Sequence, residues 1–456
     1  MKKVYLHIGA PKTGTTQLQD LLYLNRDKLR AGGVLYPAER FDQHFLAALD
    51  LLGKKWGGLE KQAVGVWDTL AAQANAWDGT VVISHEILAA ASPRQVSRAL
   101  SAIEGEVHVI YSVRDLARQI PAEWQEGVKH RRKMSYVEFL DDLSSDEPQT
   151  AVLQWFWSVQ HWPQVLDRWG STLPPEQVHV VTVPPPGASR SLLLNRFLRV
   201  LEIDRQWLTV PSERANPSLG GAETTVIRNL NLRLTSRRLK GPHYRHFVRE
   251  VLVHQTLADR PGTEKITIPP SLYGWVASTT RDWIASLQSR GYTIVGDLAE
   301  LEPSRPSVDW YDPDEASDAE QLAVAYRIIE ALLLELAARE PAAGAGPRPV
   351  TRREKVKRVA IRLAGPRIAG AGLRVYRRVP RRLGRWVSAS PAPELTSGVP
   401  ADLVSGEAVG DRADPSAQHR DATSHQQCCA AAADLGDHLG RHFGRNPAVE
   451  LGVVHR

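Results

Sequence analysis

Residues 9–16, Gly-Ala-Pro-Lys-Thr-Gly-Thr-Thr, place a lysine and three threonines among glycines in one short turn. The turn follows Val4–Ile8, an apolar run typical of a buried strand, and precedes leucines at helical spacing, with Thr15 expected to cap the helix. A strand, a turn and a helix N-terminus in this order present backbone N–H groups and a positive dipole end to an anion. Lys12 adds a positive charge, so the turn is predicted to bind a phosphate group.

The position of the lysine indicates which phosphate chemistry the turn serves. In the loop of nucleotide kinases, G-x-x-x-x-G-K-[ST], the lysine directly follows the second glycine. Here Thr15 stands at that position and Lys12 lies inside the loop. The run from Pro11 to Thr16 resembles the 5′-phosphosulfate loop of sulfotransferases that use 3′-phosphoadenosine 5′-phosphosulfate (PAPS). The resemblance implies a catalytic Lys12 and a donor-binding set of Pro11, Lys12, Thr13, Gly14, Thr15 and Thr16.

A second motif, Val113-Arg-Asp-Leu-Ala-Arg-Gln-Ile-Pro-Ala-Glu-Trp124, leaves a strand pattern and enters a helix pattern. It resembles the 3′-phosphate motif of the same enzymes, in which an arginine at a strand end precedes a serine. Arg114 matches the arginine, and a guanidinium suits bidentate recognition of phosphate. The resemblance implies that Arg114 binds the 3′-phosphate of the donor.

The second motif departs from the family pattern at Ala122, which stands where the serine is expected. One hydroxyl contact to the 3′-phosphate is therefore either missing or supplied from elsewhere, with Arg118 and Gln119 as the candidates. A surface pair of Arg114 and Asp115 that caps the helix is the alternative interpretation of the motif.

His85 and Glu86 follow a third apolar run, Val81–Ser84, and are candidates for a general base. A hydroxyl acceptor must lose its proton as it attacks sulfur, and a carboxylate or imidazole within reach contributes about 10²–10⁴-fold. Side chains alternate along an extended segment, so only one of the two is expected to face the site. Glu86 is the predicted base because the Ser-x-Glu ending resembles bacterial carbohydrate-type sulfotransferases; His85 is the second candidate, and a structural, salt-bridged glutamate is the alternative.

The apolar runs 4–8, 81–84, 107–113 and 178–183 alternate with helical patterns. Strands that alternate with helices predict an α/β fold with a parallel β-sheet flanked by helices on both faces. Ligands of such sheets bind beyond the carboxyl ends of the strands, where the three candidate segments lie. The resemblance implies the P-loop NTPase-like fold of sulfotransferases.

The resemblance to sulfotransferases covers residues 1–300, which are predicted to form one domain. A helical extension is expected over 301–340, followed by a linker and basic segment over 341–387. The composition of residues 388–456 predicts a disordered tail. Residues 351–387 hold thirteen Lys and Arg against one acidic residue, a net charge of +12. Since the whole chain carries +6, the other residues sum to −6. Nucleic-acid binding by the whole protein is therefore disfavoured, and the basic segment is either a solvated tail or a contact with anionic membrane.

The composition also limits the class of protein. A hydrophobic content of 43% supports a sizeable core, and the two cysteines, Cys428 and Cys429, are adjacent and cannot build a disulfide framework. Residues 1–20 lack the apolar region of a signal peptide, and no run approaches the roughly 20 apolar residues of a membrane span. We expect a cytoplasmic protein, with peripheral contact at the inner membrane surface as a variant of that expectation.

These patterns together predict a sulfotransferase that moves a sulfuryl group from PAPS to a hydroxyl or amine of a carbohydrate, glycolipid or small metabolite. Adenosine 3′,5′-bisphosphate is the expected product, and no metal is expected to take part. The alternatives are a P-loop kinase, opposed by Thr15 at the lysine position, and a non-catalytic nucleotide- or membrane-binding relative, for which Ala122 and the basic segment argue.

Overall fold

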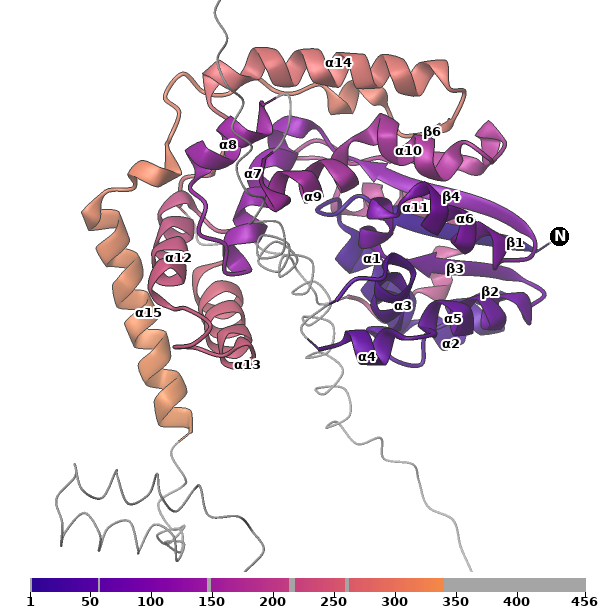
Figure 1. Ribbon diagram of the computed structural model, residues 1–456, viewed down its shortest axis with the longest axis horizontal. Helices are drawn as coiled ribbons and strands as arrows, with labels where there is room; N and C mark the ends of the chain where they lie inside the picture. The colour runs from indigo at the N-terminus through magenta and orange to yellow at the C-terminus, as the bar shows by residue number, and fades with distance from the viewer. Residues whose placement is uncertain (1, 56–57, 146–148, 213–217, 259–261, 340–456) are drawn as a thin grey trace, which may run out of the picture. The chain divides into compact units, whose positions relative to one another are not determined.

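The computed structural model describes residues 2–55, 58–145, 149–212, 218–258 and 262–339 (Figure 1). The described residues up to Leu333 lie within one compact unit, and a second unit begins at Leu334. The predicted basic segment, 351–387, and the predicted tail, 388–456, lie outside the described residues. Within the described ranges, no helix has the length and apolar character that a bilayer crossing needs.

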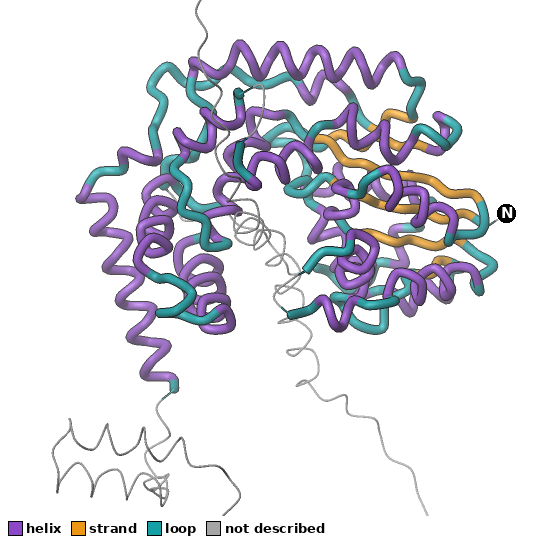
Figure 2. The backbone as a smooth tube through the Cα atoms, viewed as in Figure 1, coloured by secondary structure: helices purple, strands orange, loops and turns teal. Residues whose placement is uncertain are grey.

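The centre of the fold is a six-stranded sheet in which every pairing is parallel, with the strand order β2-β3-β1-β4-β5-β6 (Figure 2). Its strands are β1 (Lys3–Gly9), β2 (Val34–Leu35), β3 (Thr80–Ser84), β4 (Glu106–Val113), β5 (Val178–Thr182) and β6 (Thr293–Val295). The predicted parallel α/β sheet is confirmed. The two strands that the sequence did not indicate, β2 and β6, contain two and three residues, too few for a recognisable apolar pattern.

Helices flank both faces of the sheet (Figure 1). The longer ones are α1 (Thr15–Leu24), α2 (Arg26–Ala31), α3 (Gln43–Leu52), α5 (Val66–Asn75), α6 (Pro93–Ser101), α7 (Leu116–Lys129), α8 (Tyr136–Leu143), α9 (Ala151–Gln160), α10 (Trp162–Gly170), α11 (Arg190–Leu201), α12 (Gly221–Arg233), α14 (Tyr273–Ser289) and α15 (Asp318–Ala338). The shorter ones are α4 (Glu60–Ala63) and α13 (Gly241–His243), with a 3₁₀ turn η1 (Glu86–Ala90) after β3 and a π-helical segment η4 (Tyr244–Leu257).

Alternate side chains of each strand enter two separate cores. Leu6 and Ile8 pack with the helices α3, α5, α6, α9 and α10, whereas Tyr5, Val82 and Ile110 pack with α1, α2 and α11. Because successive side chains of a strand point to opposite faces, a sheet buried on both sides needs apolar residues at nearly every position. This requirement explains why the predicted strands read as continuous apolar runs.

Two details of the helices differ from the sequence-based prediction. The residue at the N-cap of α1 is Gly14, with its backbone in the left-handed region, and Thr15 is the first helical residue rather than the cap. The tryptophans at 155, 157, 162 and 169 predict one helix over 149–169 that packs on the sheet, but this stretch is two helices. The chain breaks at His161, whose side chain accepts a hydrogen bond from the backbone N–H of Gln164. Trp162 and Trp169 are buried, as expected for side chains that pack on the sheet.

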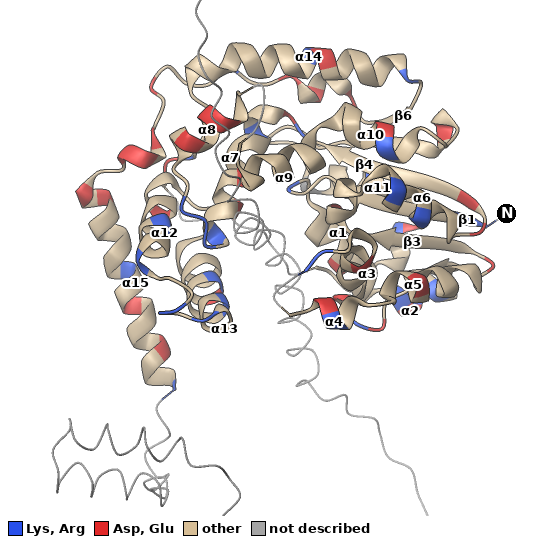
Figure 3. Ribbon diagram, viewed as in Figure 1, with Lys and Arg blue, Asp and Glu red and all other residues tan. Residues whose placement is uncertain are grey.

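Charged side chains of both signs are interspersed over the described elements (Figure 3). This distribution agrees with the sequence, in which the excess of positive charge belongs to residues 351–387.

Candidate functional site

The turn between β1 and α1 is held by side chains that bind its carbonyl groups. Ser112 Oγ donates to the Gly9 carbonyl at 2.8 Å, and Thr13 Oγ1 donates to the Ala10 carbonyl at 2.6 Å. The amides of Gln119 on α7 and Gln160 on α9 both donate to the Pro11 carbonyl, at 2.7 and 3.2 Å. The Lys12 carbonyl accepts from Arg114 Nη1 at 3.3 Å. Four consecutive carbonyl groups are thus bonded to side chains, three of them to side chains of surrounding elements and one to Thr13 of the turn itself.

The backbone of this turn also adopts conformations that most residues avoid. Lys12 has a φ of +63° and Gly14 a φ of +86°. The left-handed region is uncommon for a residue other than glycine, and such strain is concentrated at functional sites. Gly9 has a φ of +144°, and a Cβ there would lie 2.9 Å from the Glu86 carbonyl oxygen, so glycine allows the turn to approach η1. The turn is therefore a specific backbone shape rather than a loose connection.

The threonines of the turn have different surroundings. Thr13 is buried, and its hydroxyl, which donates to the Ala10 carbonyl, lies beside Ser112 Oγ of β4. Thr15 is buried, Thr16 is partly exposed, and both stand in the first turn of α1. The first backbone N–H groups of a helix have no intrahelical acceptor, and helix N-termini are for this reason common anion-binding positions. Thr13 therefore has a structural bond, whereas Thr15 and Thr16 lie where an anion would bind.

Lys12 forms an ion pair with Glu126 of α7, with 2.6 Å between Nζ and Oε2, and each side chain is 14% exposed. The other Glu126 oxygen lies 3.0 Å from His130 Nε2. Burial lowers the pKa of His130 to about 3, so the ring is neutral and donates this bond. Burial raises the pKa of Glu126, but the Lys12 charge and the His130 bond outweigh that effect and hold the pKa well below its usual value. Glu126 is therefore a carboxylate at neutral pH.

A second carboxyl group of α7, Glu123, lies one helical turn before Glu126. Gln160 Nε2 donates to Glu123 Oε1 at 2.9 Å, and burial raises the pKa of Glu123 although the Lys12 charge lowers it. Both glutamates line a small cavity of about 40 Å³ with Arg132 and the ring of Trp155. The Lys12 charge thus acts on two carboxyl groups whose pKa values are shifted in opposite directions, upward for Glu123 and downward for Glu126.

Arg114, the predicted 3′-phosphate residue, stands directly after β4 and is partly buried. Burial and the neighbouring Arg118 charge lower its pKa to about 10, so it is still a cation at neutral pH. Arg118 itself pairs with Asp115 and donates to the Pro184 carbonyl at 3.1 Å. Asp115 caps α7, since its carboxylate accepts from the Arg118 backbone N–H. Asp115 therefore caps the helix, as the alternative interpretation has it, while the guanidinium of Arg114 is bonded to the Lys12 carbonyl of the turn 9–16.

The structure also shows the surroundings of Ala122, which stands at the serine position of the second motif, and of its neighbours Arg118 and Gln119. Ala122 lies in the second turn of α7, directly after Pro121. Gln119 is buried and its amide nitrogen is bonded to the Pro11 carbonyl, so this residue holds the turn. Arg118 is committed to Asp115. Arg114 is therefore the cation at this strand end with the fewest competing bonds among the described residues.

Glu86 and His85, the two base candidates, are both buried at the end of β3. Glu86 Oε2 accepts a hydrogen bond from Gln19 Nε2 of α1 at 2.9 Å. Burial raises the pKa of Glu86, but the effects of His85, Gln19 and Lys12 outweigh it, so the pKa lies below its usual value. His85 Nδ1 accepts from the Ile87 backbone N–H at 3.3 Å, and burial lowers the pKa of this ring. The carboxylate of Glu86 is therefore ionised at neutral pH, while His85 caps η1.

The strand end that carries Glu86 is supported by two further histidines. His44 Nδ1 accepts from the Ser84 backbone N–H at 3.1 Å, and His7 Nδ1 lies 2.7 Å from Ser84 Oγ. Burial lowers the pKa of each ring to about 4, so both are neutral at pH 7. These rings position the end of β3 without adding charge to it.

The structure brings the sequence-predicted residues together at one edge of the sheet. β3, β1 and β4 are neighbours, and Glu86, Lys12 and Arg114 follow their carboxyl ends. Sequence reasoning missed Glu126 and Gln160 as partners of the turn. The spacing of Glu123 and Glu126 indicates one helix face, but nothing in the sequence indicates that Lys12 lies opposite it.

Comparisons with protein-family models, with curated proteins and with solved structures gave no match to this chain.

Proposed function

We propose that the protein is a PAPS-dependent sulfotransferase whose donor site is built by the turn 9–16 and Arg114. The observation that carries the proposal is the turn itself, in which four consecutive carbonyl groups are bonded to side chains. The turn leads into the N-terminus of α1, and the N-terminus of a helix favours a bound anion through its dipole and its first backbone N–H groups. A lysine inside the turn and an arginine at the next strand end suit a donor with phosphates at two positions.

In this proposal the first helical turn of α1 and the hydroxyls of Thr15 and Thr16 bind the 5′-phosphate of the donor. Arg114 binds the 3′-phosphate, which distinguishes PAPS from ATP-like donors. Arg118 supports this site indirectly, because its pairing with Asp115 fixes the start of α7. Ala122 adds no hydroxyl, so the grip on the 3′-phosphate depends on Arg114.

The reaction is an in-line displacement at sulfur. The acceptor oxygen forms a bond to sulfur as the bond between sulfur and the bridging phosphate oxygen breaks, and adenosine 3′,5′-bisphosphate leaves. Lys12 stabilises the negative charge that grows on the bridging oxygen, and Glu86 takes the proton of the acceptor hydroxyl. His85 is the less suitable base because its Nδ1 already accepts a backbone hydrogen bond.

A calorimetric titration of the full chain tests the proposed function. We expect adenosine 3′,5′-bisphosphate to bind with a Kd in the micromolar range and ATP to bind more weakly, since ATP lacks the 3′-phosphate. Binding of ATP without adenosine 3′,5′-bisphosphate would instead support a P-loop kinase. No binding of either nucleotide at high micromolar concentration would contradict both enzymes.

A further inference from the structure

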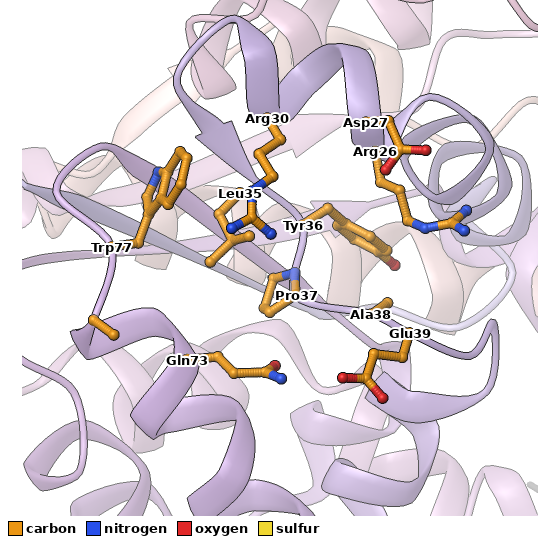
Figure 4. Close-up of a pocket in the computed structure, with 11 residues that line it drawn as sticks. Arg26, Asp27, Arg30, Leu35, Tyr36, Pro37, Ala38, Glu39, Gln73 and Trp77 are labelled. Atoms are coloured by element: carbon orange, nitrogen blue, oxygen red, sulfur yellow. The ribbon is translucent and has the colours of Figure 1, made fainter.

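A second and much larger cavity, of about 550 Å³, lies along the edge strand β2 (Figure 4). Its walls come from α2, from residues 35–39 after the start of β2, and from the end of α5. We call this cavity the edge pocket and define it by Arg26, Arg30, Tyr36, Glu39, Gln73 and Trp77. Its volume lies in the range of roughly 300–1,000 Å³ that small-molecule sites occupy. The edge pocket is therefore large enough for a ligand of one or two rings.

One wall of the edge pocket pairs a cation with an aromatic ring. The guanidinium carbon of Arg30 lies 5.2 Å from the ring centre of Trp77, and the indole N–H donates to the Gly33 carbonyl at 3.3 Å. Arg30 is exposed, and it forms no ion pair with another described residue. A stacked guanidinium is preorganised for a planar anion such as carboxylate. This wall suits a ring that bears a negative group.

The α5 side of the edge pocket also contains a buried oxygen that has no donor among the described residues. Gln73 Oε1 of α5 is buried and has no hydrogen-bond partner among the described residues. Buried polar atoms are almost always hydrogen-bonded, so an unpaired carbonyl oxygen beside a cavity indicates a missing donor. Glu39, with its exposed carboxylate, is a second acceptor on the pocket wall. Hydroxyl groups of a ligand would satisfy both acceptors.

The edge pocket is connected to the end of β3 through one side chain. The Tyr36 ring lies 4.2 Å from the His44 ring, and His44 Nε2 lies 3.2 Å from the Pro37 carbonyl oxygen. The other ring nitrogen of His44 accepts from the backbone of Ser84, two residues before Glu86. The Tyr36 end of the edge pocket therefore lies behind the strand end that precedes Glu86.

Arg30 and Trp77 lie beside the opposite, amino ends of β2 and β3, where Trp77 is bonded to Gly33. A ligand that fills the pocket lengthwise would extend from Trp77 toward the end of β3 that carries Glu86.

We propose that the edge pocket binds an acidic sugar unit of the acceptor, a hydroxyl-rich ring that bears one carboxylate or sulfate. The anionic group pairs with Arg30, the ring packs on Trp77, and a hydroxyl donates to Gln73 Oε1. This inference rests on the proposed function, because it assigns the acidic unit to one end of an extended acceptor whose reacting hydroxyl lies at Glu86.

Binding of defined sugars to the full chain, followed by saturation-transfer NMR and calorimetry, tests the inference. We expect glucuronic acid and glucose 6-sulfate to bind at least tenfold more tightly than glucose, and their relative affinities separate a carboxylate site from a sulfate site. Arg30→Gln and Trp77→Ala should each weaken binding of the acidic sugars by tenfold or more. Arg94→Gln, an exposed change on α6 outside the pocket, is the matched control and should leave binding unchanged.

The outcomes separate this inference from the proposed function. If adenosine 3′,5′-bisphosphate binds but the acidic sugars do not, or if Arg30→Gln leaves their affinity unchanged, the edge pocket is not an acidic-sugar site while the donor site stands. Glucose that binds as tightly as glucuronic acid would contradict the anionic class. Failure of the nucleotide alone to bind would contradict the proposed function. Arg30 is exposed, so Arg30→Gln is expected to keep the fold, which far-UV circular dichroism checks.

Discussion

Lys12 and Arg114 are neighbouring cations at the same edge of the sheet, yet the protein holds them in opposite ways. Lys12 is balanced by Glu126 at 2.6 Å, and this pairing is favourable enough to hold the pKa of the carboxylate well below its usual value. Arg114 donates to a carbonyl group, and burial with the nearby Arg118 charge lowers its pKa to about 10. An anion that reaches Arg114 relieves an unfavourable positive charge, whereas one that reaches Lys12 competes with Glu126.

This difference divides the proposed work of the site. Arg114 gains most from a bound phosphate, so it should contribute mainly to donor affinity. Lys12 gains little in the ground state, because its charge is already balanced, and should act when charge builds on the leaving oxygen. Interactions that strengthen only in the transition state raise turnover rather than affinity. Variants of the residues on the Lys12 side should therefore change turnover, and variants of Arg114 should change binding.

The largest expected effect is that of Glu86→Gln. Without a proton acceptor, transfer from PAPS should fall by about 10²–10⁴-fold, while the affinity for adenosine 3′,5′-bisphosphate stays within about twofold. Transfer is followed as nucleotide release in the presence of a mixture of hydroxyl and amine acceptors. A fully active Glu86→Gln protein beside an inactive His85→Ala protein would show that the base is His85.

Lys12→Ala should lower turnover by about 10²–10³-fold, the usual effect of removing one group that stabilises transition-state charge. Nucleotide affinity should change far less, since Lys12 is already paired with Glu126. Lys61→Ala, an exposed change on α4, is the control. If Lys12→Ala loses affinity and turnover in equal proportion, the division between the two cations is wrong.

Glu126→Gln should raise the affinity for adenosine 3′,5′-bisphosphate. Removing the carboxylate frees Lys12 and takes away a negative charge, so the Kd of adenosine 3′,5′-bisphosphate should fall about 3- to 10-fold, the effect of roughly 1 kcal/mol. The amide can still accept the His130 bond, which keeps α7 in place. Glu104→Gln, in an exposed loop, serves as the control for charge alone. Weaker nucleotide binding by Glu126→Gln would mean that Glu126 positions Lys12 for the donor.

The last prediction concerns stability rather than donor binding or turnover, and it involves the neutral histidines behind the end of β3. His7 and His44 have pKa values of about 4 in the folded protein, against 6.5 in the unfolded chain. Between these values the unfolded chain binds more protons, so stability should fall as pH drops from 6.5 to 4, by up to about 3 kcal/mol for each ring. His44→Gln should reduce that loss in urea unfolding at pH 7.0 and 4.5. An unchanged pH dependence in the variant would contradict this origin.

The apolar runs of the sequence were sufficient to predict four of the strands and the strand-end location of the candidate residues. β2 was not predicted because two residues carry no recognisable pattern, and its position at the sheet edge comes from pairing with β3. The edge pocket could not be predicted either, because α2, the residues after β2 and the end of α5 come together only in the folded chain.

The partners of Lys12 could not be predicted from sequence for a related reason. Glu126 is more than a hundred residues away, on a helix whose apolar and polar faces are readable but whose neighbour across the site is not. Gln119 was expected near the 3′-phosphate because of its position in the motif, yet its amide holds the Pro11 carbonyl. Local spacing indicates which residues share a face, whereas the choice of partner depends on how the helices pack on the sheet.

The most direct test of the account is a thermodynamic cycle that combines one mutation, Arg114→Gln, with removal of the 3′-phosphate from the ligand. The affinities of adenosine 3′,5′-bisphosphate and AMP are measured for the unaltered protein and for Arg114→Gln, with Arg94→Gln as the control. We predict that the unaltered protein prefers the bisphosphate by about 10- to 100-fold, as a charge-assisted bond of about 1.5–3 kcal/mol implies, and that Arg114→Gln removes the preference. Equal affinities for the two nucleotides in the unaltered protein, or a preference that survives in Arg114→Gln, would contradict the assignment of Arg114 to the donor.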